Sequence, residues 1–503
     1  SGAVSAMTQR YILALDQGTT SSRAILYNEA AEPVAVSQQA IQQYFPKPGW
    51  VEHDAVEIWD KQRAVAREVI DRAGIRVGDI AAVGITNQRE TTVIWERATG
   101  RPIHPAIVWQ DRRTSDYCRA MRDRGECDRI AEKTGLLLDP YFSATKVQWL
   151  LQHVDGALAR AEAGELAFGT MDCWLAWNLS GGKAHITDAG NASRTLLFNI
   201  HTLEWDAELL ELFGVPAALL PTVVDSSGLL AETDPEVLGA AIPLAGMAGD
   251  QQAAMFGQLC IEPGMVKCTY GTGCFLTMNI GERVIHSRHR LLTSVAWKIG
   301  EQLHYALEGS VFMGGATLQW LRDGLQFFSD ESESEALATS VDDCDGVVVV
   351  PALTGLGAPH WDEHARGTIL GITRGTTRAH ITRAALEGIC YQVNDVIDTM
   401  VKDRNEAITE MRVDGGATVN NFMVQFQADI SGIDVIRPVN LETTALGAAY
   451  LAGLGAGLWT RAQLAGKWAI EKTFEPVMDR ASLARHLQQW QKGVQRAKNW
   501  TSD

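Results

Sequence analysis

Near its start the chain reads Tyr11-Ile-Leu-Ala-Leu-Asp-Gln-Gly-Thr-Thr-Ser-Ser-Arg-Ala-Ile-Leu-Tyr27, two apolar runs separated by a polar turn. The runs predict a buried β-hairpin, in which Gly18 permits a tight turn that leaves backbone N–H groups free. The turn carries side chains suited to phosphate oxygens, namely Thr19, Thr20, Ser21 and Arg23. Asp16 ends the first strand and is suited to hold Mg2+ through water. We interpret the stretch as a phosphate-binding hairpin beside a metal ion, although a polar hairpin without a ligand explains so short a turn equally well.

A second copy of this pattern lies far downstream. The stretch from Met265 to Asn279 again has a strand, a Gly-Thr turn that includes Thr272, and a second strand. Two such hairpins suggest two related halves that face one nucleotide. A third turn, Asp414-Gly-Gly416, precedes a stretch whose apolar side chains recur at helical spacing. Bare glycines beside a helix N-terminus suit a nucleotide.

The order of these three parts resembles the actin, Hsp70 and sugar-kinase superfamily of ribonuclease-H-like ATP-binding folds. The resemblance implies an α/β protein with two such domains and a cleft for ATP and substrate between them. The length agrees, because 503 residues exceed the roughly 250 to 300 at which one hydrophobic core usually divides. Strand-like and helix-like stretches alternate on both sides of Gly257, so we expect domains over 7–258 and 259–503.

The composition favours a globular protein and excludes some partners. Hydrophobic residues make up 46% and charged residues 21% of the chain, which is typical of a packed globular fold. The net charge of -17 argues against a nucleic-acid partner, which requires a surplus of Lys and Arg. The longest uncharged stretch, 445–459, is rich in Gly and Ala and too short to span a membrane. It predicts a tightly packed internal helix.

The cysteines and the first residues bear on cellular location. Eight cysteines are dispersed without a Cys-x-x-Cys pair, which predicts a reducing compartment and hence a cytoplasmic protein. No charged and then apolar leader stands before Met7. Residues 1–6 read as a remnant of expression, so we expect the natural protein to begin at Met7.

Polar and aromatic residues between the hairpins suggest a polyol pocket. Arg89 and Glu90 follow an apolar strand end, where ligand groups gather in open α/β sheets, and they offer donors and acceptors to neighbouring hydroxyls. Trp109 and Tyr141 add aromatic surface. Each has a plainer explanation, because exposed Arg–Glu pairs are common, Trp109 could lie in the core and Tyr141 could be a capped aromatic.

One carboxylate follows an apolar run in Gly249-Asp-Gln-Gln252. Phosphoryl transfer to an alcohol requires a group that orients the hydroxyl and accepts its proton, and Asp250 is a candidate for this base. The alternative is that Asp250 only caps the following helix, which is a common role for Asp at such a position.

Two longer stretches identify the family that the chain resembles. The stretch Tyr141-Phe-Ser-Ala-Thr-Lys-Val-Gln-Trp-Leu-Leu-Gln-His153 and a second from Gly367 to Glu387 are similar to the two signatures of the FGGY carbohydrate kinases. Marks of the branch that phosphorylates glycerol lie at 46–54, 86–90, 139–142, 249–252 and 269–275. The similarity covers nearly the whole stretch from Tyr11 to Trp500.

This resemblance implies a transferase that uses Mg-ATP to phosphorylate glycerol to sn-glycerol 3-phosphate, the first step of glycerol catabolism. Glycerol would be bound by Arg89, Glu90, Trp109, Tyr141, Asp250, Gln251 and Phe275, with Asp250 as the catalytic base. ATP would be bound by Thr19, Thr20, Ser21, Arg23, Thr272, Gly315, Gln319, Gly416 and Asn420, and Mg2+ by Asp16. The family also implies a homo-oligomer, a dimer or a tetramer, without nucleic acid or a membrane span.

Two other functions fit part of the same pattern. Another sugar kinase of the family, acting on xylulose, ribulose or gluconate, would keep both hairpins and the base, but Arg89, Glu90 and Tyr141 favour a small triol. An actin-like or Hsp70-like ATPase would share the nucleotide cleft, but it does not explain the acceptor-side stretches.

The segment 226–237 bears on regulation. Family members inhibited by fructose 1,6-bisphosphate carry there a Gly-rich loop that ends in Arg, and others offer a His for phosphorylation. In this chain the segment is acidic and has no His, so we expect a loop that repels an anionic effector.

Overall fold

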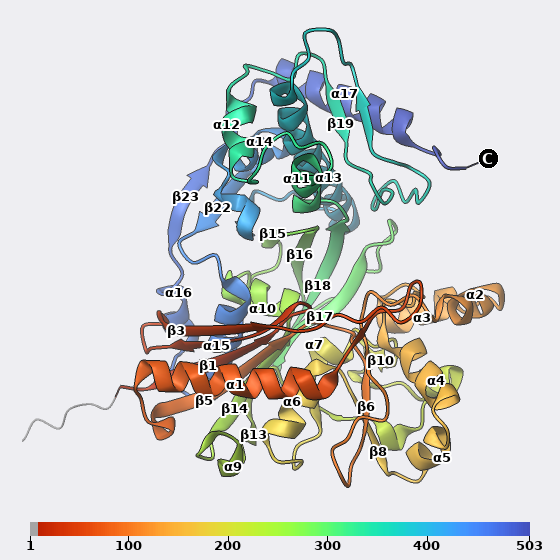
Figure 1. The fold of residues 1–503 in the computed structure, drawn as a ribbon, viewed down its shortest axis with the longest axis vertical. Helices are drawn as coiled ribbons and strands as arrows, with labels where there is room; N and C mark the ends of the chain where they lie inside the picture. The colour runs from red at the N-terminus through yellow and green to blue at the C-terminus, as the bar shows by residue number, and fades with distance from the viewer. Residues whose placement is uncertain (1–8, 503) are drawn as a thin grey trace, which may run out of the picture.

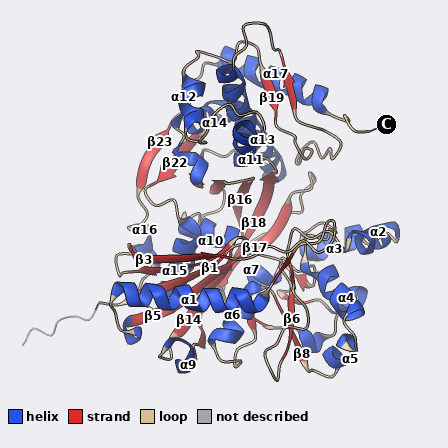
Figure 2. Cartoon of the chain, in the orientation of Figure 1, coloured by secondary structure: helices blue, strands red, loops and turns tan. Residues whose placement is uncertain are grey.

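The computed structural model describes residues 9–502 and consists of a lower and an upper part, each built on one mixed β-sheet (Figure 1). The expected start at Met7 lies outside the described residues. Figure 2 shows helices gathered around the strands of both parts. No helix within residues 9–502 combines the length and the apolar character needed to cross a bilayer.

The lower sheet contains the first predicted hairpin. Its strand order is β13 (Ser227–Glu232), β14 (Pro243–Gly249), β5 (Ile80–Asn87), β1 (Tyr11–Gln17), β2 (Ser21–Tyr27) and β3 (Pro33–Ala40). Strands β14, β5 and β1 are parallel, whereas β1 and β2 are antiparallel. Gln17 pairs with Asn87, and Asn87 pairs with Gly249. This register brings the ends of the three parallel strands, and the residues that follow them, to one edge of the sheet.

The upper sheet repeats this plan. Its order is β17 (Leu292–Ile299), β18 (Gln302–Val311), β16 (Cys274–Gly281), β15 (Val266–Tyr270), β21 (Glu410–Asp414), β22 (Asp434–Pro438) and β23 (Ile470–Phe474). β15 and β16 form the second predicted hairpin, and β15, β21 and β22 are parallel. A hairpin beside two further parallel strands therefore occurs in both sheets, which confirms the prediction of two related halves.

The remaining elements are short ribbons and helices. The ribbons pair β4 (Glu52–His53) with β7 (Ala106–Ile107), β6 (Val93–Glu96) with β8 (Leu166–Gly169), β9 (Ile186–Asp188) with β12 (Thr222–Val224), β10 (Phe198–Asn199) with β11 (Glu204–Trp205), and β19 (Val348–Val350) with β20 (Thr368–Leu370). The helices are α1 (Ala55–Ala73), α2 (Ser115–Asp123), α3 (Cys127–Thr134), α4 (Ser143–His153), α5 (Ala157–Glu162), α6 (Met171–Leu179), α7 (Ala189–Ala192), α8 (Ala207–Phe213), α9 (Pro235–Leu238), α10 (Asp250–Gly257), α11 (Gly315–Asp323), α12 (Glu333–Thr339), α13 (Arg378–Arg404), α14 (Asn421–Ser431), α15 (Thr443–Gly455), α16 (Arg461–Ala465) and α17 (Arg480–Ala497).

The two faces of the lower sheet pack against different helices because strand side chains alternate between faces. Leu13 and Leu15 belong to a hydrophobic cluster that includes α1, whereas Ile12 and Ala14 belong to one that includes α10 and α15. Helix α1 is amphipathic, and the Asp54 side chain caps its N-terminus by accepting N–H groups of the first turn. The lower sheet is thus covered on both faces.

Helix α15 comes from the C-terminal part of the chain but packs on the lower sheet. It covers most of 445–459 and is almost entirely buried, which confirms the predicted internal helix. Its contact with α10 is exceptionally close, because a Cβ atom on Gly447 would lie 1.7 Å from the Ala253 carbonyl oxygen. The division of the chain at residue 258 stays a prediction.

The expectation of a loop over 226–237 was wrong. The segment forms the edge strand β13 and the short helix α9. The strand forms because its backbone pairs antiparallel with β14, a long-range partner that the local sequence does not reveal.

Candidate active site between the two hairpins

Arg89 and Glu90 lie directly beyond β5 and are buried, with 5% and 1% of their surface exposed. An exposed surface pair is therefore excluded. Arg89 Nε lies 3.6 Å from Glu90 Oε1 and 3.3 Å from Asp250 Oδ1. A Cβ atom on Gly249 would lie 2.7 Å from Arg89 Cγ, so glycine lets β14 end this close to the aliphatic part of the Arg89 side chain. Glu90 has a φ of 62°, a left-handed conformation that is uncommon outside glycine and that concentrates at functional sites.

Two further charges complete this cluster. Glu308 on β18 accepts a hydrogen bond from Arg89 Nη2 at 2.7 Å and pairs with Arg194 Nη1 at 2.9 Å. Arg194, which follows α7, also lies 3.4 Å from Glu90 Oε1. Burial alone would raise the pKa of Glu308, but Arg194 and Arg89 hold it at about 2. Opposite charges therefore alternate through a buried cluster that joins both sheets.

Asp250 is the first residue of α10, and Gly249 occupies the N-cap position. The Oδ1 atom of Asp250 accepts a hydrogen bond from the Gln251 N–H group at 2.8 Å, and the Asp250 carboxylate remains partly exposed. The observed geometry is therefore not that of an Asp that caps the helix. Partial burial raises the pKa of Asp250 above its ordinary value, while Arg89 acts in the opposite direction. Burial also raises the pKa of Asp16, and the negative charge of Asp250 adds to this rise, so the two carboxylates share one electrostatic environment.

Trp109 connects the acceptor side to the first hairpin. Its Nε1–H group donates to Thr19 Oγ1 at 3.0 Å, and its ring meets that of Tyr141 edge to face at 5.7 Å. The guanidinium of Arg194 lies 5.4 Å from the centre of the Tyr141 ring. Both rings are half-buried, so neither is a fully buried core residue. The predicted phosphate turn and the predicted acceptor residues are thus in direct contact.

Lys267 holds Gln251 from the second sheet. This lysine on β15 is fully buried, and its Nζ donates to Gln251 Oε1 and, at 2.9 Å, to Thr269 Oγ1. Thr269 in turn donates to Asp414 Oδ1 at 2.5 Å. Burial lowers the pKa of Lys267, and Asp414 partly offsets that effect. A chain of hydrogen bonds therefore connects Gln251, which was predicted to bind glycerol, with Asp414 in the third Gly-rich turn.

The second hairpin turn is joined to helix α11. The N–H group of Gly315 donates to the Gly271 carbonyl at 2.7 Å, and that of Ala316 donates to the Thr272 carbonyl at 3.1 Å. These two N–H groups at the helix N-terminus already have acceptors, and their hydrogen bonds hold the Gly271–Thr272 turn against the start of α11. Gln319 lies one turn further along α11 and is exposed, whereas Phe275 lies on β16 opposite Thr269 and is half-buried.

The third turn presents open backbone. Gly415 has a φ of 97°, and a Cβ atom there would lie 2.3 Å from the Tyr270 carbonyl oxygen, so glycine is required. A Cβ atom on Gly416 would meet nothing within 4 Å. The Asn420 side chain caps α14 by accepting the Met423 N–H group at 3.0 Å. Gly416 therefore borders free space beside a capped helix N-terminus.

The first turn is only partly available for a ligand. Thr20 is exposed, while the Ser21 hydroxyl accepts a hydrogen bond from Gln38 at 3.0 Å. Arg23 Nη2 lies 2.9 Å from Asp16 Oδ2 and 2.7 Å from Glu442 Oε2. Arg23 is therefore paired with two carboxylates in this structure.

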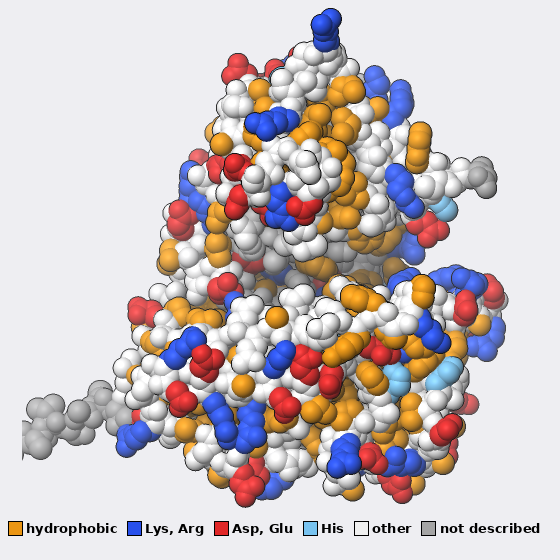
Figure 3. All heavy atoms as spheres, in the orientation of Figure 1, with side chains coloured by type: hydrophobic (Ala, Val, Ile, Leu, Met, Phe, Trp, Pro, Cys, Tyr) orange, Lys and Arg blue, Asp and Glu red, His pale blue; other side chains and the backbone are white. Residues whose placement is uncertain are grey.

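Comparison with known proteins decides the family. Residues 11–257 match the N-terminal domain of the FGGY family of carbohydrate kinases, and residues 266–456 match the C-terminal domain of the same family. The chain belongs to the FGGY family of carbohydrate kinases. Figure 3 shows a hollow between the two parts of this FGGY kinase.

Relatives of this FGGY kinase include proteins named glycerol kinase. One from Deinococcus radiodurans is 58% identical over 495 residues, which cover 98% of this chain and 99% of the relative. One from Symbiobacterium thermophilum is 56% identical over 498 residues, or 99% of this chain and 100% of the relative. The solved glycerol kinase of Plasmodium falciparum with ADP has a TM-score of 0.92 at 35% identity, covering 97% of this chain and 98% of that one.

A second solved structure supports the fold alone. The xylulose kinase of Lactobacillus acidophilus has a TM-score of 0.86 at 22% identity over 97% of both chains. The two-domain α/β fold expected from the sequence is thereby confirmed.

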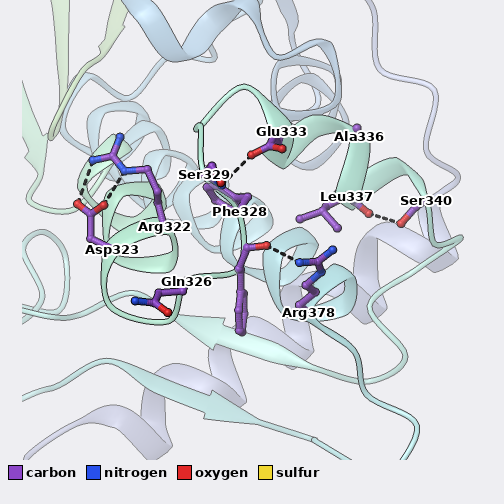
Figure 4. A pocket seen from close by; sticks show the side chains of 11 residues that line it. Arg322, Asp323, Gln326, Phe328, Ser329, Glu333, Ala336, Leu337, Ser340 and Arg378 are labelled. Atoms are coloured by element: carbon purple, nitrogen blue, oxygen red, sulfur yellow. Dashed lines mark hydrogen bonds and ion pairs between the residues drawn. The ribbon is translucent and has the colours of Figure 1, made fainter.

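A separate hollow of about 810 Å3 lies between α11, α12 and the start of α13 (Figure 4). Its lining includes Arg322, Phe327, Glu333 and Arg378. None of the residues predicted to bind glycerol or ATP lines it. The hollow is therefore distinct from the cluster around Arg89.

Sequence reasoning missed Arg194, Glu308 and Lys267. Arg194 lies in Asn191-Ala-Ser-Arg194-Thr195, a dense run of small and polar residues that could have been noticed. Glu308 and Lys267 each interrupt an apolar strand, and a charge within a buried strand is the available signal.

Proposed function

We propose that this FGGY kinase transfers the γ-phosphoryl group of Mg-ATP to glycerol and releases sn-glycerol 3-phosphate and ADP. The observation that carries the proposal is the buried Arg89–Glu90 pair directly beside Asp250. Such a pair offers donors and acceptors to adjacent hydroxyls, next to a carboxylate that can take a proton. The names of relatives that are identical at more than half of their positions, over nearly their whole length, support this choice.

On the acceptor side, Arg89 donates to glycerol hydroxyls and Glu90 accepts from them. Tyr141 and Gln251 also hydrogen-bond glycerol, and Lys267 holds the Gln251 side chain in place. Trp109 and Phe275 pack against the carbon backbone. Asp250 orients the reacting hydroxyl and accepts its proton. The raised pKa of Asp250 suits this role, because a base with a higher pKa has a stronger affinity for the proton.

On the nucleotide side, hydroxyls of the two hairpin turns contact phosphate oxygens, and open backbone accommodates the nucleoside. The residues assigned to this role are Thr19, Thr20, Ser21, Arg23, Thr272, Gly315, Gln319, Gly416 and Asn420. The space in front of Gly416 supports the assignment. Arg23 reaches a phosphate only when it exchanges one of its two carboxylate partners for that phosphate.

Mg2+ fits the residues present at Asp16. Burial raises the pKa of Asp16, the charges of Asp250 and Glu442 add to this rise, and Arg23 opposes it. A divalent cation beside Asp16 would stabilise the ionised carboxylate in this buried position. Asp16 would hold the ion through water, and the ion would neutralise charge on the β- and γ-phosphates. Arg23 remains beside Asp16 and keeps its carboxylate oriented.

The cellular location and the oligomeric state also belong to this proposal. We place the enzyme in the cytoplasm, which agrees with eight free cysteines in the described part of the chain. We also expect a dimer or tetramer, on the basis of the family alone.

The test is ADP release from Mg-ATP with glycerol, xylulose, ribulose, gluconate or no acceptor, for the wild type and Asp250→Asn. We expect turnover with glycerol that falls by about three orders of magnitude in the variant, while ATP binding is retained. Preference for another polyol would refute the substrate assignment. Turnover without an acceptor would favour an actin-like or Hsp70-like ATPase, and full activity in the variant would exclude Asp250 as the base.

A further inference from the structure

Three metal-ligating side chains converge outside the active site. They are Glu132 in α3, His201 just after β10, and His286 between β16 and β17. One ligand atom of each residue lies within 4.8 Å of the others. His286 Nε2 lies 3.4 Å from Glu132 Oε2, His201 Nε2 lies 3.9 Å from Glu132 Oε1, and the two imidazole rings are 5.4 Å apart.

The geometry points to a binding site for one divalent transition-metal ion of the Zn2+ class, formed by Glu132, His201 and His286. Two imidazoles and one carboxylate are a preferred donor set for Zn2+. Mg2+ prefers oxygen ligands, so the site differs in selectivity from the one at Asp16. Bond lengths of about 2.0 to 2.1 Å place ligand atoms of a tetrahedral site about 3.4 Å apart, so the exposed side chains need to close by little more than 1 Å.

Hydrogen bonding alone explains only part of this cluster. His201 Nε2 lies 2.8 Å from the Glu132 backbone oxygen, which accounts for the position of one imidazole. This hydrogen bond does not account for the position of His286, which lies in the connection between β16 and β17 of the upper sheet. His286 approaches both the Glu132 carboxylate and the His201 ring. Two imidazoles around one carboxylate leave a common point that a cation can occupy.

The backbone around the cluster is already held in place. Ile200 N–H donates to the Lys133 carbonyl at 3.0 Å, and Thr293 N–H donates to the Gly135 carbonyl at 2.9 Å. Figure 1 shows α3, β10 and β17 in the same region of the molecule. The ion therefore cross-links α3 to the β16–β17 connection without rearrangement of the chain. Because it binds the folded state, it raises thermal stability as its concentration exceeds the dissociation constant.

Calorimetric titration of the chelator-treated full-length protein with Zn2+, without ATP, tests the site. We compare the wild type with His286→Asn, Glu132→Gln and the matched control His364→Asn. His364 is also exposed and lies 3.5 Å from the neighbouring Glu363, but the cluster of metal-ligating groups does not include it. Loss of a group that only supports a ligand already costs about 10- to 100-fold in metal affinity, so loss of a direct ligand should cost at least about 10-fold.

The expected result is one Zn2+ per wild-type chain, binding at least about 10-fold weaker in His286→Asn and Glu132→Gln, and unchanged binding in His364→Asn. The melting temperature should rise with Zn2+ in the wild type and the control only. Equal Zn2+ binding by all four proteins would overturn the proposal, and so would absence of binding by the wild type. All substituted side chains are exposed, so the variants are expected to fold, and their unliganded melting temperatures check this directly.

Discussion

At the scale of single residues, the candidate active site is a cluster in which each buried charge has an opposite neighbour. Arg89 contacts Glu90, Glu308 and Asp250, and Arg194 contacts Glu90 and Glu308. Removing one member leaves the remaining buried charges with fewer opposite partners, which is costly in a low-dielectric interior. The cluster therefore places the Arg89 guanidinium beside the Asp250 carboxylate, 3.3 Å from its Oδ1 atom.

Lys267→Met should weaken glycerol binding more than ATP binding. Lys267 bonds the side chain of Gln251 rather than substrate, and hydrogen bonds to charged groups contribute about 1.5 to 3 kcal/mol, so we expect KM for glycerol to rise by about 10-fold or more. Steady-state kinetics with each substrate varied separately measure the split. Lys298→Met, which removes a half-buried lysine paired with Asp225, is the control. An equal rise in both KM values would contradict a positioning role.

The pH dependence of kcat/KM for glycerol should show the raised pKa of Asp250. The base acts only when ionised, so its protonation on the acid side removes activity, and a raised pKa moves this loss to higher pH than for an ordinary Asp. Arg89 lowers the pKa of Asp250, so Arg89→Gln should move the acid limb to still higher pH. If the acid limb of the profile stays at the same pH in Arg89→Gln, then Arg89 does not influence the pKa of the group that titrates.

At the scale of elements, glycine sets how closely α10, which carries Asp250, approaches α15. A Cβ atom on Gly257 of α10 would lie 2.0 Å from the Thr443 carbonyl oxygen, and one on Gly447 of α15 would be closer still to α10. Helix α10 begins with Asp250, so the position of α10 on α15 determines where the proposed base lies. Helices α10 and α15 therefore contact each other through their backbones, without side chains between them at these two glycines.

Gly447→Ala should therefore destabilise the fold and displace Asp250. Overpacking a tight contact costs about 1 to 3 kcal/mol, and here backbone must move, so we expect the upper end of that range and a reduced kcat. Chemical denaturation and kinetics measure the two effects. Gly78→Ala is the matched control, because an added methyl group there meets nothing within 4 Å. Similar stability of both variants would show that α10 and α15 separate easily.

At the scale of the whole molecule, the proposed acceptor residues other than Phe275 belong to the lower part, whereas the proposed nucleotide residues come from both parts. Thr19, Thr20, Ser21 and Arg23 belong to the lower hairpin, and Thr272, Gly315, Gln319, Gly416 and Asn420 belong to the upper part. The strand pair β17–β18 runs from the upper part toward the lower part, and helix α15, which follows the upper sheet in the sequence, packs on the lower sheet (Figure 1). Lys267 and Glu308 reach from the upper sheet to residues of the lower one. Both substrates together can therefore draw the halves closer, and closure excludes water from the phosphoryl group.

Glycerol and a non-hydrolysable ATP analogue should together reduce the radius of gyration measured by small-angle X-ray scattering. Gly416→Leu fills the open space assigned to the nucleotide, so this variant should bind glycerol but fail to compact. Compaction of the variant equal to that of the wild type would place the nucleotide elsewhere. A radius that does not change in the wild type would contradict closure itself.

The sequence by itself determined the two hairpins, the internal helix 445–459, the family, and the candidate roles of Asp16, Arg89 and Asp250. These features are readable because strand alternation, turn glycines and local motifs depend on residues near one another in the chain. Only the tertiary structure decided that Glu308 and Arg194 complete the charge cluster, that Lys267 holds Gln251, and that 226–237 forms an edge strand and a short helix. Arg89 and Glu308 are 219 residues apart, and such a contact follows from how the two sheets pack rather than from any local pattern.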